Sequence, residues 1–222
     1  MTKLFFIEAS PPVRDSDSVR IADAYLKELR RQDFAVQVDR INLWNEDLPP
    51  FDAIRVTAQE NVMTGRSHNS LQKAAWNEIV RLSERFTGAD RYLLAVPMWN
   101  NSIPYRLKHY IDLIHQPGLT FGLGPESGFF GLLRNKQATL VLTAGINSEC
   151  FPAPAFGEDF HSTYLRSWLN QTGIVDIDEI RFQLSILTAD PAGEFAKAEH
   201  AAITLAQRHA RCPQQQSPVS IQ

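Results

Sequence analysis

Hydrophobic and polar positions alternate along the chain in blocks, with short apolar runs separated by segments in which apolar residues recur at helical spacing. The first apolar run covers residues 4–7 and is followed by a helical pattern from Val19 to Leu29. Residues 36–41 alternate between apolar and polar side chains, which is typical of a strand with one exposed face. The chain is therefore predicted to open with a strand, a helix and a second strand that lies near the sheet edge.

The most informative run covers residues 92–96, which are apolar without alternation and stop at Pro97. Such a run is typical of a strand buried on both faces, as in a parallel sheet flanked by helices. Pro97 should end the strand ladder because proline has no N–H, and Pro104 suits the first turn of the next helix. We therefore expect a buried strand, a Trp- and Asn-rich loop, and then a helix to about His115.

The rest of the chain continues this alternation of strands and helices. The further predicted elements are a loop at 43–51, a polar helical hairpin or broken helix with helical spacing from 71 to 82, strands at 138–145 and 180–187, and helices at 164–170 and 191–205. Residues 119–133 interrupt the alternation, since they are rich in Gly and Phe and their pattern predicts a small hairpin. We expect this hairpin on the same sheet edge as the turn after Val96, where it would form a pocket wall.

Five strands that alternate with helices predict an α/β fold, with a five-stranded parallel sheet covered by helices on both faces. We expect one domain over residues 1–211, and the Gln-, Pro- and Ser-rich residues 212–222 are predicted to be a disordered tail. In such sheets, ligands bind beyond the carboxyl ends of the strands, where the strand order reverses. The turns that follow residues 7, 96 and 142 are therefore candidate parts of one site.

Composition and charge exclude several classes of partner. The chain has 222 residues and a formal net charge of -3, with acidic and basic residues interspersed, so neither nucleic acid nor an anionic membrane is an expected partner. No apolar run approaches the roughly 20 residues of a membrane span, and the N-terminus lacks a signal-peptide pattern, so we expect a cytoplasmic protein. The two cysteines and six histidines show no metal-ligand spacing, and no metal site is predicted.

The first candidate turn runs from Ser10 to Ser18 and contains three serines, Ser10, Ser16 and Ser18, near the predicted helix start. A helix N-terminus carries a partial positive charge and unpaired amides, so phosphate binds well there, and hydroxyls add donors. The alternative is ordinary N-capping of the helix by Ser16 or Ser18. Asp17 disfavours phosphate binding, because a carboxylate repels a phosphate.

The second candidate turn contains Trp99, which can lie against a flat ligand, and Asn100 and Asn101, whose amides can contact polar ring edges. The alternative is a loop whose tryptophan packs into the core. The third turn, residues 143–146, has side chains small enough for close backbone approach to a ligand. The last two turns together are compatible with an aromatic ligand.

These residues resemble the signature of the FMN-dependent NADH-azoreductase and quinone reductase family. The matching stretches, in chain order, are Ser10 with Ser16-x-Ser18, Val96-Pro97-Met98-Trp99-Asn100, Ile103-Pro104, Leu107-Lys108, Ile111-Asp112, Gly118-Leu119-Thr120-Phe121, Tyr164-Leu165 and Gly173-Ile174. They span nearly the whole predicted domain.

The resemblance implies a flavodoxin-like, doubly wound fold and a homodimer with two sites at its interface. It also implies ping-pong electron transfer from NADH or NADPH, through bound FMN, to quinones or azo compounds. The FMN phosphate is expected at Ser10, Ser16 and Ser18, with Asp17 contributing its backbone. The residues expected around the flavin ring are Pro97, Met98, Trp99, Asn100, Asn101, Thr143, Ala144, Gly145 and Ile146. Phe121 is expected in the substrate pocket, and Trp168 is a second candidate for it, although its place on a helix is equally compatible with the core.

The chain departs from the family pattern at three places. Residues 143–146 read Thr-Ala-Gly-Ile where many relatives have Ser-Arg-Gly-Gly, and Asn101 replaces a frequent Phe or Gly. Asp17 stands where an uncharged residue is common, and we expect its carboxylate to turn away from the phosphate. Two rival functions remain from the residues alone: an ester hydrolase with Ser10 or Ser16 as nucleophile, and a non-enzymatic flavin electron carrier.

Overall fold

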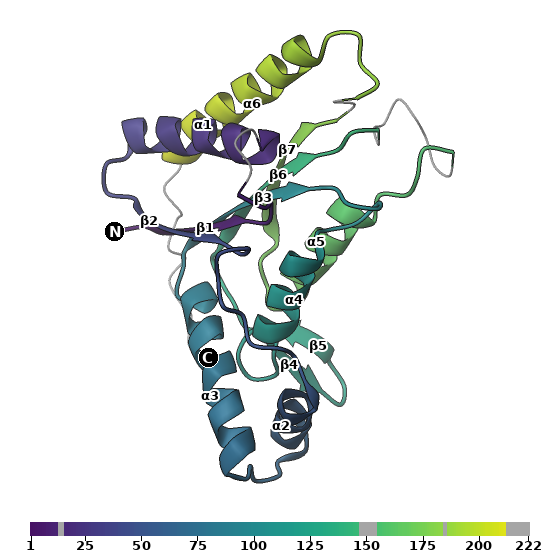
Figure 1. Cartoon of the computed structure of the whole chain (residues 1–222). Helices are drawn as coiled ribbons and strands as arrows, with labels where there is room; N and C mark the ends of the chain where they lie inside the picture. Colours follow the sequence, from purple (N-terminus) through teal and green to yellow (C-terminus); the bar gives the residue numbers. More distant parts are fainter. Residues whose placement is uncertain (13–15, 147–154, 184–185, 212–222) are drawn as a thin grey trace.

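Figure 1 shows the computed structural model of the chain, which describes residues 1–12, 16–146, 155–183 and 186–211. Residues 212–222, predicted to be a disordered tail, lie outside these ranges. Five parallel strands form one sheet in the order β2-β1-β3-β6-β7. The strands are β1 (Lys3–Glu8), β2 (Gln37–Asn42), β3 (Arg91–Pro97), β6 (Gln137–Thr143) and β7 (Asp176–Phe182). The predicted five-stranded parallel α/β fold is confirmed.

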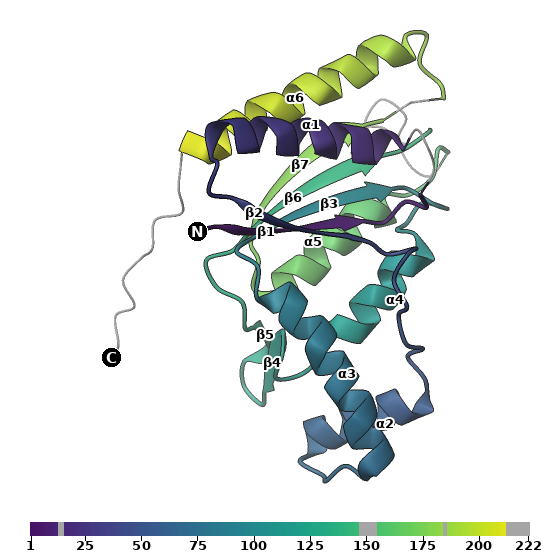
Figure 2. The same ribbon diagram turned by 60° about the vertical axis from the view of Figure 1, so that its left-hand side comes forward.

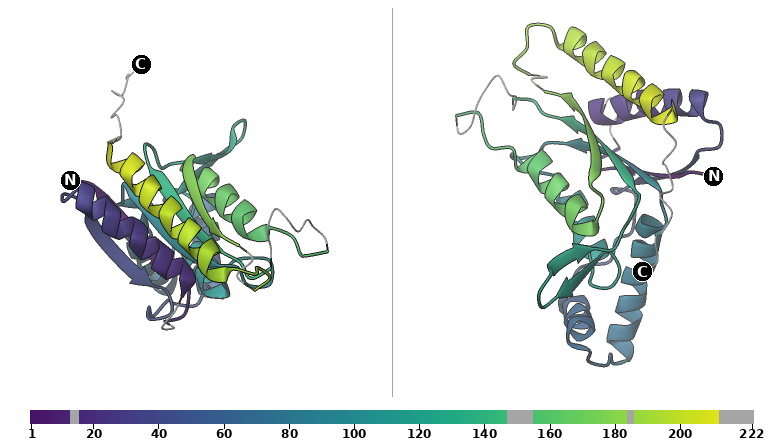
Figure 3. Two further views of the ribbon diagram at one scale, coloured as in Figure 1. Left: turned by 90° about the horizontal axis from the view of Figure 1, so that it is seen from above. Right: turned by 180° about the vertical axis from the view of Figure 1, so that it is seen from behind.

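The helices cover both faces of the sheet. Figures 2 and 3 show α1 (Asp17–Gln32) and α6 (Pro191–Arg211) side by side on one face, with α3 (Ser70–Thr87), α4 (Tyr105–Ile114) and α5 (Phe160–Thr172) on the other. The short helix α2 (Ala53–Thr64) packs on α3 beyond the sheet, so the predicted polar helical hairpin is also confirmed. Each sheet face therefore has its own apolar core.

The three inner strands explain why the apolar runs were informative. Residues 4–8 of β1, 91–96 of β3 and 138–142 of β6 are buried without interruption, because helices cover both of their faces. Strand β2 lies at the sheet edge and is more exposed than the inner strands, with Gln37, Asp39 and Arg40 at the surface, as its mixed pattern predicted. Inner strands and an edge strand thus give different sequence patterns within a single sheet.

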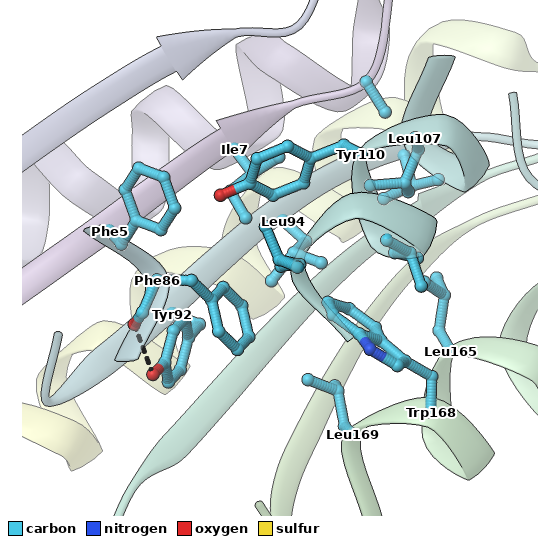
Figure 4. Close-up of a cluster of buried hydrophobic side chains, with 14 of the residues drawn as sticks. Phe5, Ile7, Phe86, Tyr92, Leu94, Leu107, Tyr110, Leu165, Trp168 and Leu169 are labelled. Carbon is cyan, nitrogen blue, oxygen red and sulfur yellow. Dashed lines mark hydrogen bonds between the residues drawn. The ribbon is translucent and has the colours of Figure 1, made fainter. Parts of the chain in front are cut away.

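The core on the α3–α5 face contains Trp168, for which the sequence left both the core and the substrate pocket open. Figure 4 shows its ring among the side chains of α5, β3 and the end of α3. Trp168 is 3% exposed, and its ring centroid lies 5.5 Å from that of Phe86. The structure therefore places Trp168 in the hydrophobic core, because α5 turns this face toward the sheet.

The predicted hairpin within residues 119–133 is present as β4 (Phe121–Gly124) and β5 (Gly128–Gly131), which pair antiparallel. Its expected position was wrong. Helix α4 leads away from the carboxyl end of β3, so the hairpin lies at the amino ends of the strands (Figure 1), where the Leu133 N–H donates to the Thr172 carbonyl at 2.9 Å. The hairpin cannot form a wall beside the turn after Val96 within one chain.

The last strand was predicted at 180–187 but spans Asp176–Phe182. Its first half carries Asp176, Asp178 and Glu179, which a sheet edge tolerates because their carboxylates reach solvent or arginines. Ile186 and Leu187, which extended the apolar pattern, are instead exposed residues of a turn. The predicted range lay too far toward the C-terminus because it was chosen to cover apolar residues. This edge strand instead begins with acidic residues.

Candidate functional site

The three candidate turns lie side by side at the carboxyl ends of β1, β3 and β6. Strand β3 lies between the other two strands, and backbone bonds continue past the ladders into the turns. The Ala9 N–H donates to the Ala95 carbonyl at 3.0 Å, and the Met98 N–H donates to the Thr143 carbonyl at 2.7 Å. The sheet thus brings together segments that are far apart in the sequence, as the topology predicted.

The first turn brings three serine hydroxyls together at the start of α1. The Ser16 hydroxyl donates to Ser10 Oγ at 2.9 Å, and the Ser18 hydroxyl lies 3.2 Å from Ser10 Oγ and 3.3 Å from Ser16 Oγ. Ser16 occupies the N-cap position of α1, yet its side chain makes no capping bond to the helix. The hydroxyls therefore form a polar cluster beside the unpaired amides of a helix N-terminus, an arrangement suited to an anion.

The Asp17 carboxylate points out of this cluster. It lies 3.3 Å from the Arg20 guanidinium on the exposed side of α1, and Arg20 also lies over the ring of Phe195. This placement agrees with the expectation that the carboxylate turns away from the phosphate position. A negative charge at the helix start also favours the helix itself.

Strand β2 supports the serine turn through residues that sequence reasoning did not single out. Asn42 donates from its side-chain amide to Glu8 Oε2 at 2.9 Å and to the Ser10 carbonyl at 3.3 Å. Glu8 is largely buried and is neutralised by Arg40, which also pairs with Asp23. A charged residue at the end of an otherwise apolar strand was the available signal, since a buried carboxylate needs partners.

The second turn is a tight hairpin turn. Trp99 and Ser102 exchange backbone bonds of 2.8 and 2.9 Å, and the two residues between them have positive φ angles, 48° for Asn100 and 66° for Asn101. Asparagine is one of the few non-glycine residues that adopts this left-handed conformation readily. The paired asparagines are thus explained by backbone geometry as well as by any contact with a ligand.

The third turn follows β6 and is bonded to the end of β7 and to the residues after it. The Ala144 N–H donates to the Phe182 carbonyl at 3.0 Å, and the Gly145 carbonyl accepts from the Ile186 N–H at 3.0 Å. A Cβ atom on Gly145 would lie 2.7 Å from Ile186 Cδ1, so a larger residue here would displace that side chain. The small residues predicted to allow close approach therefore accommodate a protein side chain in this structure.

Two hollows flank the second turn. One, of about 560 Å³, lies between the second and third turns and is lined by Met98, Asn100, Asn101, Gly145, Ile146, residues 155–157, Ile186 and Leu187. The other, of about 780 Å³, lies on the far side of Trp99 and is lined by Pro50, Phe51, Trp99, Asn100, Ser102, Ile103, Tyr105, Lys108, His109, Asp112 and Tyr164. Most predicted ring-binding residues thus border a hollow, whereas Phe121 and Trp168 line neither.

Phe121 lies at the amino ends of the strands, together with the rest of the hairpin. It is 5% exposed and packs against His115 and Phe129, with ring centroids 4.6 and 5.4 Å apart. Its assignment to a substrate pocket finds no support within one chain. A third hollow, of about 630 Å³, also lies at the amino ends of the strands, between β1 and β2, and is remote from the three turns.

One buried histidine lies close behind the second turn. Burial lowers the pKa of His161 to about 4, and interactions with the Asp159 carboxylate and the Val96 backbone oppose this only in part. His161 is 2% exposed, and within the described ranges its Nε2 atom has no hydrogen-bond partner. The ring is therefore neutral near pH 7, and it was not a candidate in the sequence.

Two further properties of the described part of the chain bear on the site. No group of three or more His, Cys, Asp or Glu side chains is placed to hold a metal ion there. None of its helices combines the length and the apolar character needed to cross a membrane.

Comparison with known proteins gives consistent similarities. Residues 2–205 match a family model described as having a flavodoxin-like fold. The chain is 47% identical over 198 residues to an FMN-dependent NADH:quinone oxidoreductase of Ruegeria pomeroyi, covering 89% of this chain and 97% of that protein. It is 36% identical over 216 residues to FMN-dependent NADH:quinone oxidoreductase 3 of Pseudomonas fluorescens, covering 95% and 99%.

Two solved structures show the same fold. An azoreductase from Bacillus anthracis superposes with a TM-score of 0.84 at 22% identity, covering 94% of this chain and all of that one. An FMN-dependent NADH-azoreductase from Bacillus anthracis, solved in complex with FMN, gives 0.83 at 24% identity and covers 95% and 100%. At these identities the likeness concerns the fold.

Proposed function

This chain belongs to the FMN-dependent NADH:quinone oxidoreductase family of flavodoxin-like proteins, and we propose that it binds FMN and passes electrons from NADH or NADPH to quinones or azo compounds. The observation that carries this proposal is the cluster of Ser10, Ser16 and Ser18 hydroxyls at the start of α1. This cluster lies at the carboxyl ends of the strands, as does the hollow between the second and third turns. A phosphate site and a ring-sized hollow, both at the carboxyl ends of the strands, fit a flavin mononucleotide.

The residues present fit each part of that cofactor. The serine hydroxyls and the free amides of the α1 N-terminus are donors, which a phosphate dianion requires. Met98, the asparagine pair at 100–101 and the turn at 143–146 would hold the ring system, with Trp99 at the edge of the second hollow. When bound, FMN would supply the electron-transfer chemistry, and the protein would supply binding, orientation and electrostatics.

Two backbone N–H groups beside the hollow between the second and third turns give the chain hydrogen-bond donors for the ring of the cofactor. Within the described residues, the N–H groups of Gly145 and Ile146 make no backbone hydrogen bond, whereas that of Ala144 is bonded to β7. Preorganised amides of this kind stabilise developing negative charge without reorganisation during the reaction. We assign these two amides to the polar edge of the ring.

The second hollow suits a flat organic acceptor. Its walls include the aromatic rings of Phe51, Trp99, Tyr105 and Tyr164, and Lys108 and Asp112 pair with each other at its rim. Aromatic walls with a few polar groups favour planar, weakly polar ligands over charged ones. Quinones and azo compounds belong to that class.

The rival hydrolase function is disfavoured by the surroundings of the serines. In the described part of the chain, the Ser10 and Ser16 hydroxyls contact each other and Ser18, and no histidine contacts them. A serine nucleophile needs an adjacent base to become reactive. These hydroxyls are arranged as hydrogen-bond donors to an anion.

The proposal also includes a homodimer. The hairpin exposes three large apolar side chains, Leu123, Phe129 and Phe130, as expected of a surface that another chain covers. Light scattering should give twice the chain mass of 25.1 kDa. A monomeric mass would remove this part of the proposal and leave FMN binding to be judged separately. A cytoplasmic location stays a prediction from the sequence.

Absorption spectroscopy tests the central claim. Purified protein should retain or take up FMN and show a flavin band, and anaerobic NADH or NADPH should bleach it. Adding a quinone should restore the band, and the rates should give parallel double-reciprocal plots for donor and acceptor. A protein that stays colourless with excess FMN contradicts the proposal, while bleaching without recovery by quinones or azo dyes indicates an electron carrier.

A further inference from the structure

Trp44 lies between two turns of the proposed FMN site and contacts both. Its indole Nε1 donates to the Ala9 carbonyl at 2.8 Å, directly before the serine turn. Its ring lies 5.6 Å from the ring of Trp99, centroid to centroid, and 5.3 Å from that of Tyr105 at the start of α4. One side chain from the loop after β2 thus links the end of β1 with the turn after β3.

The backbone of Trp44 is itself held in place. Its N–H donates to Asn42 Oδ1 at 3.0 Å, and the amide group of the same Asn42 donates to Glu8 and to the Ser10 carbonyl. The carbonyl of Ser10, the first residue of the serine turn, and that of Ala9 directly before it are therefore both bonded to this short segment. Such a network fixes the direction in which the serine turn leaves β1.

Trp99 depends on this contact for its orientation. Its main chain is fixed by the bridge to Ser102, but its side chain is 36% exposed and lines the second hollow. Within the described residues, Trp44 is the aromatic ring that packs on it. An exposed indole without such a neighbour would sample several rotamers, and a ligand would have to order it on binding.

We propose that Trp44 is a positioning residue for FMN, which orients the serine turn through its N–H group and Trp99 through its ring. The inference rests on the proposed FMN-binding function. It separates two contributions within one side chain: the hydrogen bond to Ala9 acts on the phosphate end of the site, and the aromatic face acts on the ring end. Trp44 itself lines neither hollow.

Two substitutions separate these contributions. Trp44→Phe keeps an aromatic ring and removes the N–H donor, whereas Trp44→Leu removes both. Dissociation constants are measured by flavin fluorescence for FMN and for riboflavin, which has the ring but no phosphate. Trp76→Phe and Trp76→Leu are the matched controls, because Trp76 is a partly buried tryptophan on α3 that packs on His68, away from the three turns.

We expect Trp44→Phe to weaken FMN binding about three- to tenfold, the range that one hydrogen bond represents, and to change riboflavin binding by less than twofold. Trp44→Leu should weaken both ligands and alter the visible circular dichroism of the bound flavin, since Trp99 is then no longer oriented. The Trp76 variants should leave both dissociation constants and the dichroism unchanged. Thermal unfolding of each variant identifies losses that arise from folding.

The outcomes distinguish this inference from the function on which it rests. If the unmodified chain does not bind FMN, the proposed function fails. If it binds FMN but Trp44→Phe leaves the ratio of riboflavin to FMN dissociation constants unchanged, the positioning role is overturned. The role is equally overturned if the Trp44 and Trp76 variants lose affinity in proportion to their loss of thermal stability.

Discussion

Acidification should destabilise the protein through His161, and the size of the effect follows from its surroundings. The side chain is 2% exposed and burial lowers its pKa to about 4, from 6.5 for the free side chain. The folded state therefore binds this proton less readily than the unfolded state does. The stability that the neutral ring contributes is present above pH 6.5 and is lost as the pH falls from 6.5 toward 4.

The magnitude follows from the two pKa values. At pH 5, the unfolded state is mostly protonated at this residue and the folded state is mostly not, which corresponds to about 2 kcal/mol of lost unfolding free energy. The full shift corresponds to about 3 kcal/mol once the pH is below 4. Losses of this size are a large fraction of the stability of a typical domain.

Replacing the ring with leucine isolates this contribution. His161→Leu removes the titrating group, and near pH 7.5 its unfolding free energy should fall by about 0.5–1.5 kcal/mol, because the ring's hydrogen bond to the Val96 backbone is lost while its Nε2 atom has no partner in the described residues. Urea unfolding of FMN-free protein at pH 7.5 and 5.0, at constant ionic strength, gives the two free energies for each variant. His200→Leu, at an exposed position on α6, controls for the loss of any histidine.

The difference between variants is the decisive quantity. Other buried groups, such as His115 and His209, whose pKa values burial also lowers, titrate in both proteins and cancel in the comparison. The unmodified protein should lose about 2 kcal/mol more than His161→Leu between the two pH values. Equal losses in the two proteins would refute the reasoning that burial keeps His161 neutral.

Three further predictions concern single contacts. Ser18→Ala should raise the dissociation constant for FMN about tenfold to a hundredfold, the effect of a charge-assisted hydrogen bond, and leave that for riboflavin unchanged; equal weakening of both would contradict the phosphate assignment. Gly131→Ala would place a Cβ atom 2.1 Å from the Gly173 nitrogen, so calorimetry should show a loss of about 1–3 kcal/mol, and an unchanged transition would mean that the hairpin can move away. Tyr25→Phe removes the hydroxyl that contacts His209 Nδ1 at 2.7 Å, and urea unfolding should show a loss of about 1–3 kcal/mol unless another group replaces it.

The positions of the strands were predictable where helices bury both faces of a strand. The inner strands β1, β3 and β6 are covered on both faces, so their sequences are continuous apolar runs that mark their positions. Strand β7 was misplaced because a strand at the sheet edge does not need such a run. Its Asp178 and Glu179 pair with Arg208 and Arg166, contacts between residues whose proximity no local pattern reveals.

The position of the β4–β5 hairpin could have been derived by counting. Helix α4 has ten residues and rises about 15 Å, which is about two thirds of the roughly 23 Å length of the seven-residue strand β3. The hairpin that follows must therefore begin near the amino ends of the strands. The sequence-based expectation used the order of the elements along the chain and did not add the direction of the intervening helix.

The candidate site was predictable as a set of turns but not in its internal construction. Ser10, Ser16 and Ser18 meet as expected, because the start of α1 follows β1 closely. Asn100 and Asn101 were assigned to a ligand, although adjacent asparagines between paired residues also predict a tight hairpin turn. Both roles are compatible, since the turn fixes the backbone and leaves the two side chains at a hollow.

Each turn of the site is closed by protein contacts that need no ligand. The bonds from Met98 to Thr143, from Ala144 to Phe182 and from Trp44 to Ala9 hold the three turns to the strands beside them. A site organised in this way orders few residues on binding, so less of the interaction free energy is lost as conformational entropy. Substitutions in the sheet should therefore act mainly on stability, whereas substitutions at these contacts should act on cofactor affinity before they affect folding.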